Sequence, residues 1–149
     1  ALVEAGALPC GLGARDALRI EAGLPLYGHE IDDTTSPVEA LLMWAVKLDK
    51  GSFTGSAHIA EVKASGASRK LVGIVLKERI IPRQGYNLVV NGEHVGTVTS
   101  GVFSSARNAG IGMAYISAQH AGAGSIVEVE IRNNRYPAEV VPKKSLLIR

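Results

Sequence analysis

The chain has 149 residues, which suffices for one domain of ordinary size or a small domain with an appendage. Apolar residues make up 46% of it and can bury a core, while a net charge of +2 gives no reason to expect a nucleic-acid or membrane-surface partner. No apolar run approaches the roughly 20 residues that span a bilayer. The single cysteine, Cys10, excludes an internal disulfide and fits a reducing compartment.

Two parts of different character follow one another along the chain. Residues 1–66 mix helix and loop signals, whereas the residues from about 69 onward read as nearly all strand. We therefore predict an α+β protein, mainly β, with a first part at 1–66 and a β-rich domain at 67–149. The chain begins at Ala1, not at a methionine, and its first residues read as the tail of a helix, so we expect Ala1 to mark a cut in a longer protein.

The first part is expected to contain helices joined by an irregular polar loop. A short helical piece at 2–5 precedes a helix at about 13–22, which a glycine cap and a following proline end. Residues 36–39, Ser-Pro-Val-Glu, are typical of a helix start. The apolar run 41–46 fits either a buried strand or a continuing helix, and residues 55–64 are weakly helical.

The second part carries clear strand signals. The stretch 70–76 is rich in branched apolar residues, and apolar and charged residues alternate in 127–131. Asn91-Gly92 lies between two strand-like runs, and both residues tolerate the positive φ that a tight hairpin turn needs. A second hairpin is predicted around Asn133-Asn134. Strands at this spacing predict a small antiparallel barrel or sandwich of about six strands.

A glycine pair at 11 and 13 precedes the first predicted helix and suggests a phosphate-binding loop. The dinucleotide fingerprint needs a third glycine at position 16, where this chain has Asp16, and no strand precedes the pair. Arg15 is more informative, because a cation in the first turn opposes the helix dipole and Arg19 adds a like charge one turn later. Arg15 therefore either forms a structural salt bridge or faces an anionic ligand, for which a carboxylate suits its planar fork.

The loop that follows the first predicted helix holds possible metal ligands, but in no recognisable pattern. The group comprises His29, Glu30, Asp32 and Asp33, and it lacks both the zinc-protease and the calcium-loop spacing. We expect a solvated loop and no metal site. Trp44, the single tryptophan, lies in an apolar run and is expected in the core.

An ordered series of segments closely resembles the glycine cleavage system T-protein family over almost the whole chain. No single segment is specific, but the series is. The segments are 11–23 (which holds Gly-Ala-Arg-Asp), 26–28 (Leu-Tyr-Gly), 31–32, 36–40, 44–47, 53–55, 69–73, 82–86, 95–101 and 112–115. The chain is thus identified as similar to the C-terminal portion of that family.

The resemblance implies an aminomethyltransferase of glycine cleavage. The family enzyme takes the aminomethyl group from the lipoyl arm of H-protein, transfers the one-carbon unit to tetrahydrofolate and releases ammonia. Its three domains form a cloverleaf around the folate, and its all-β C-terminal domain resembles residues 69–149. The implied partners are lipoylated H-protein, tetrahydrofolate as co-substrate and the rest of the T-protein chain. Nucleic acid and membrane are not among them. The implied location is the bacterial cytoplasm or the mitochondrial matrix.

The resemblance also assigns folate contacts. Arg15 takes the role of the family arginine in Gly-Ala-Arg-Asp, and Arg149 is the nearest match to a C-terminal arginine that contacts folate in many bacterial members. The Pro-Phe that usually precedes that arginine is absent, and residues 142–148 stand in its place. The family's key aspartate and a folate-contacting glutamate are expected upstream of Ala1. We therefore expect no catalytic residue here, and no activity of this segment alone.

Two other folate-related classes remain as alternatives. The C-terminal regions of sarcosine and dimethylglycine dehydrogenases share the architecture, but the spacing from Gly-Ala-Arg-Asp to Ser-Pro-Val-Glu fits T-protein better. A flavin-binding fingerprint upstream would favour those enzymes. The other class is a non-catalytic folate-binding module of iron–sulfur cluster assembly, whose cysteine motif is not found, since Cys10 lies in a different context.

Overall fold

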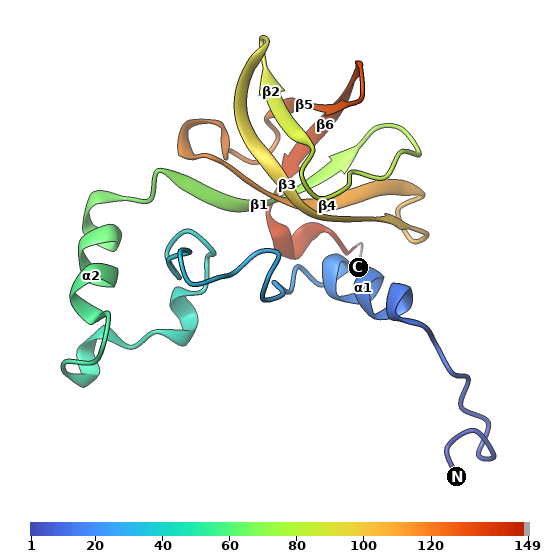
Figure 1. The fold of residues 1–149 in the computed structure, drawn as a ribbon, viewed down its shortest axis with the longest axis horizontal. Coiled ribbons are helices and arrows are strands. Elements are labelled where there is room, and N and C mark those ends of the chain that lie inside the picture. Colours follow the sequence, from blue (N-terminus) through green and yellow to red (C-terminus); the bar gives the residue numbers. More distant parts are fainter. Residues whose placement is uncertain (148–149) are drawn as a thin grey trace.

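A closed antiparallel barrel forms the larger part of the computed structural model, which describes residues 1–147 (Figure 1). The strand order is β1-β4-β3-β2-β5-β6, and pairing of β1 with β6 closes the barrel. The prediction of a mainly β, α+β protein with about six strands is confirmed. The strands are β1 Arg69–Leu76, β2 Asn87–Val90, β3 Glu93–Ser104, β4 Ala109–Ser117, β5 Ile126–Ile131 and β6 Asn134–Val141.

Helices occur mainly before the barrel. The helix expected at about 13–22 is α1, Leu12–Glu21, and the weakly helical stretch is α2, Ser56–Ser65. Short 3-10 turns complete the set: η1 Met43–Ala45, η2 Leu48–Lys50, η3 Ala118–His120 and η4 Lys143–Ser145. Among residues 1–147, no helix combines the length and the hydropathy that crossing a membrane requires.

Both predicted hairpins are present. Asn91 and Gly92 link β2 to β3 with φ values of 52° and 86°, the left-handed conformation that these residue types accept. The second turn lies one residue earlier than expected, because β6 already begins at Asn134. Arg132 follows β5 with φ 58°, so an arginine adopts the left-handed conformation in this turn.

Two apolar clusters hold the molecule together. The first fills the barrel and contains branched residues from all six strands, including Ile74, Leu88 and Val129. The second lies on the outer face of the barrel, where strand residues meet α1 and the C-terminal turn. Its members are Ile20, Leu71, Ile111, Met113, Tyr115 and Leu146. Because β4 contributes to both clusters, it is buried on both faces.

Glycines allow the chain to cross closely over β3 and β4. A Cβ added at Gly101 would lie 1.7 Å from the carbonyl oxygen of Pro82, and one added at Gly110 would lie 1.7 Å from that of Ile80. Any larger residue would collide with this backbone. The segment 80–82 therefore rests directly on the barrel wall.

Several expectations for the first part are wrong. Residues 2–6 form turns, not the short helical piece expected at 2–5. Glu39 accepts a hydrogen bond from the Ser36 backbone N–H at 3.1 Å, yet residues 36–42 form turns and no helix. Leu41 has a φ of 55°, which an α-helix cannot contain, and the apolar run continues as turns and a 3-10 helix. Trp44 is 74% exposed, so the prediction that it lies in the core is wrong.

Candidate ligand-binding site at helix α1 and the barrel

Helix α1 carries two arginines one turn apart in opposite environments. Arg15 is exposed and forms no ion pair with any of residues 1–147. Arg19 is only 8% exposed and faces the barrel. The first turn of α1 has no acidic residue and no side-chain cap, so nothing there offsets the charge of Arg15. The salt bridge considered for Arg15 is formed instead by Arg19.

Arg19 lies at the centre of a buried polar network. Its Nη1 pairs with Glu30 Oε2 at 2.9 Å, and its Nη2 donates to Ser100 Oγ at 2.9 Å. Its Nε donates to Asp16 Oδ1 at 2.5 Å. Each of the three guanidinium nitrogens thus has a partner, and the network joins α1, the following loop and β3.

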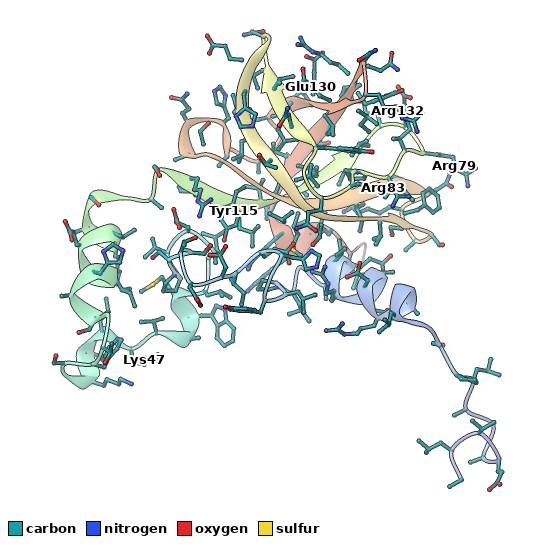
Figure 2. All side chains as sticks on the ribbon, viewed as in Figure 1. Lys47, Arg79, Arg83, Tyr115, Glu130 and Arg132 are labelled. Atoms are coloured by element: carbon teal, nitrogen blue, oxygen red, sulfur yellow. The ribbon has the colours of Figure 1, made fainter. Side chains whose placement is uncertain are left out.

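Glu30 is the acidic member of this network and is 1% exposed. Its carboxylate also accepts hydrogen bonds from the Leu26 backbone N–H at 2.9 Å and from Ser100 Oγ. Its carbonyl oxygen accepts the Tyr115 hydroxyl proton at 2.8 Å, and Figure 2 shows Tyr115 where the barrel meets the preceding loop. The expectation that Glu30 belongs to a solvated loop is therefore wrong, whereas its neighbour Asp32 is exposed.

A second charged pair connects the same loop region to the start of the barrel. Arg69 Nε donates to Glu39 Oε1 at 3.1 Å, and the guanidinium lies over the Tyr115 ring at 4.5 Å from its centroid. Burial raises the pKa of the Tyr115 hydroxyl well above its usual value, and the charge of Arg69 partly opposes this. Tyr115 is therefore a neutral hydrogen-bond donor over the physiological range.

Two cavities whose walls include charged and polar side chains lie along this junction. The smaller, of about 240 Å³, is lined by Asp16, Arg19, His29, Arg83, Gln84 and residues 99–101 of β3. The larger, of about 410 Å³, is lined by side chains that include His29, Asp32, Arg69, His94 and Tyr115. Hydrogen bonds from Thr34 and Thr35 lower the pKa of Asp32, with a smaller effect of Arg69.

Of the two predicted folate contacts, Arg15 lies within the described residues. Arg15 does not line the smaller cavity, whereas the next residue, Asp16, does. Arg149 lies outside the described residues. No group of three possible ligands that could hold a metal ion occurs among residues 1–147, including the loop with His29 and its acidic neighbours.

The geometry of α1 on the barrel can be compared with known proteins. The family model described as the glycine cleavage T-protein C-terminal barrel domain matches residues 69–145, more than half of the chain. The GCVT N-terminal domain model matches residues 1–50. The chain belongs to the glycine cleavage T-protein family.

Individual T-protein relatives agree with the family models. Aminomethyltransferase from Symbiobacterium thermophilum is 53% identical over 139 residues, which cover 93% of this chain and 37% of that protein. Aminomethyltransferase from Geobacillus kaustophilus is 50% identical over 147 residues, or 95% and 40% of the two chains. This chain therefore spans about two-fifths of the length of these relatives.

A solved T-protein structure has the same fold. The glycine cleavage system aminomethyltransferase T from Bartonella henselae superposes with a TM-score of 0.85 at 35% identity. The match covers 92% of this chain and 40% of that protein.

Proposed function

We propose that this chain is the folate-binding C-terminal part of an aminomethyltransferase. The whole enzyme would transfer the one-carbon unit from aminomethyl-lipoyl H-protein to tetrahydrofolate and release ammonia, in glycine cleavage. The observation that carries the proposal is the identity of 53% to an aminomethyltransferase over 93% of the chain. The proposed partners are lipoylated H-protein, tetrahydrofolate and the remainder of a T-protein chain.

Arg15 is the proposed contact for folate on α1. Each guanidinium nitrogen of Arg19 already donates to one partner, Asp16, Glu30 or Ser100, and these contacts give Arg19 a structural role. Arg15 is exposed on the same helix, and that helix is fixed to the barrel by the buried network. Folate ends in a glutamate, whose carboxylates match a planar guanidinium in two-point contact. Arg15 would thus hold and orient the co-substrate without taking part in bond making.

Arg149 is the proposed second folate contact. Its match to the family's C-terminal arginine rests on sequence position, since it lies outside the described residues. Residue Arg107 fixes the segment just before it, donating from Nε to the Leu146 carbonyl oxygen at 2.6 Å. This hydrogen bond holds Leu146, three residues before Arg149, against the outer face of the barrel.

Titration of tetrahydrofolate by calorimetry tests the role of Arg15. We expect Arg15→Ala to weaken binding by roughly tenfold or more, because a charge-assisted contact contributes about 1.5–3 kcal/mol. Arg15→Lys keeps the charge and loses the fork, so we expect an intermediate affinity. The control is Arg132→Asn at the β5–β6 turn, where the positive φ of residue 132 suits asparagine. This variant should bind tetrahydrofolate with the affinity of the wild type. Unchanged affinity in Arg15→Ala would reject Arg15 as a contact.

A further inference from the structure

A separate cavity of about 410 Å³ lies on the outer face of the barrel, beside the ends of β1 and β6. Its volume is within the range of small-molecule sites, and its lining is mainly apolar. The apolar walls include Leu41, Leu71 and Val141, and the charged lining residues are Lys70, Lys143 and Lys144. A cavity with apolar walls and cations of one sign favours a ligand that is itself apolar with an anionic end.

Lys143 is the buried member of the three lysines, with 6% of its surface exposed. Its Nζ donates to the Ala40 carbonyl oxygen at 3.0 Å. An ammonium has three N–H donors, and the hydrogen bonds among residues 1–147 account for one of them. None of the carboxylates in residues 1–147 forms an ion pair with it. A buried ammonium with spare donors is costly, and an incoming carboxylate would compensate it.

The groups around Lys143 do not fully compensate its positive charge. Burial lowers the pKa of the Lys143 ammonium, the neighbouring Lys144 lowers it further, and Glu30 opposes both effects. Glu30 is itself paired with Arg19. The backbone of Lys143 lies close against Gly23, since a Cβ added at that glycine would lie 2.4 Å from the Lys143 carbonyl oxygen. In Figure 1 the chain after β6 lies beside α1 under the barrel.

Leu41 adds an independent indication. It is a γ-branched residue with φ 55°, a conformation that L-residues other than glycine and asparagine rarely adopt. Its side chain is 44% exposed and lines the cavity. Strained residues persist where a function retains them, and this one presents an apolar side chain to an open cavity next to a buried cation.

We infer that this cavity binds an amphipathic organic carboxylate. Its apolar body packs against Leu41, Ala123 and Val141, and its carboxylate accepts hydrogen bonds from Lys143 Nζ, with Lys70 and Lys144 at the rim. An inorganic anion would leave the apolar walls uncovered, and a neutral apolar ligand would leave the ammonium uncompensated. Arg15 does not line this cavity, so the site does not depend on the proposed folate contact.

Three probes of equal chain length test the charge requirement. Octanoate, octan-1-ol and octylammonium are titrated separately into the protein by calorimetry. We expect saturable binding of octanoate, binding of octan-1-ol that is at least roughly tenfold weaker, and none of octylammonium, since only octanoate completes the charged contact. The inference is overturned if octanoate does not bind saturably, or if octan-1-ol binds as tightly.

Matched substitutions locate the site. Lys143→Met keeps the length and burial of the side chain and removes its charge, so octanoate should bind roughly tenfold more weakly. Lys63→Met, the same change at an exposed position of α2, should leave the affinity unchanged. Ala123→Phe, at an exposed lining position, should fill the cavity and abolish binding. Thermal melts check that each variant folds. If Lys143→Met does not fold, the octanoate affinity of Ala123→Phe alone decides whether the cavity is the binding site. Wild-type affinity in either folded variant would overturn the inference.

Discussion

The residue scale is dominated by one buried ion pair and its hydrogen bonds. Arg19 and Glu30 are both buried, and Ser100 bonds to each of them. A buried pair contributes little over an apolar alternative, but removal of one partner leaves an uncompensated charge. The main effect of the network is therefore to fix the position of α1 on the barrel, and its contribution to stability is smaller. Because Arg15 lies on α1, the network also fixes the position of the Arg15 backbone.

Replacing Glu30 by glutamine tests this network. Glu30→Gln retains the shape and leaves the buried Arg19 guanidinium without a counter-charge, so we expect the free energy of unfolding to fall by on the order of 3 kcal/mol. Urea denaturation followed by circular dichroism gives the value. Glu78→Gln, the same change at an exposed position, should stay within about 0.5 kcal/mol of the wild type. Equal losses in the two variants would show that the pair does not hold α1.

The sequence identified Arg15 but not the network beside it. Arg15 could be singled out from its local sequence alone, because a cation in the first turn of a helix opposes the helix dipole. Asp16, three residues earlier, is a local partner of Arg19, but Glu30 and Ser100 lie 11 and 81 residues away, and neither of these separations is a local pattern. Only the folded barrel, which brings Ser100 beside the loop of Glu30, shows that one arginine is structural and the other exposed.

Element by element, the strands that were predicted are those with a clear residue pattern. Strand β5 alternates apolar and charged residues because one of its faces meets solvent, and β1 was found from its branched residues. Strand β4 is buried on both faces and contains Gly110 and Gly112, so it has neither alternation nor strong strand propensity. The predicted helix start at Ser36 failed because its local hydrogen bonds form in a turn as well as in a helix.

The close crossing over β3 gives a prediction for a single glycine. Gly101→Ala would place a methyl group against the Pro82 carbonyl, and we expect a loss of about 3 kcal/mol or more, measured by urea denaturation. Gly122→Ala provides the comparison, because the added Cβ there meets only Ser125 Oγ at 3.3 Å. That variant should lose less than about 1 kcal/mol. If Gly101→Ala were as mild, the segment 80–82 would have to lift from the barrel at little cost.

For the whole molecule, the outer face of the barrel is as important as its interior. The second apolar cluster joins α1 and the C-terminal turn to β1 and β4, so the first part of the chain rests on the barrel. We propose a domain boundary between residues 66 and 67: the two family matches, 1–50 and 69–145, fall on either side of it. Composition and strand spacing predicted a barrel or sandwich, while the family and its folate chemistry came from the ordered motifs.

The prediction for the whole molecule concerns its catalytic activity. We propose that the catalytic residues lie in the part of the family chain that this sequence does not span, so the segment alone should not transfer the aminomethyl group. The assay supplies aminomethyl-loaded H-protein and tetrahydrofolate and follows methylenetetrahydrofolate and ammonia. A full-length aminomethyltransferase with the same reagents should turn over. Sustained turnover by the segment would contradict the proposal and place a catalytic group within it.

Closure of the barrel by its first and last strands has a consequence for the order of folding. Gly73 of β1 pairs with Val141 of β6, so the final seam joins residues that are far apart in sequence. Contacts of such separation form late, because the intervening chain must be ordered first. During synthesis, β1 would leave the ribosome long before its partner and keep one edge unpaired until β6 follows. The growing chain therefore exposes an unpaired edge of β1, which favours aggregation, until β6 has left the ribosome.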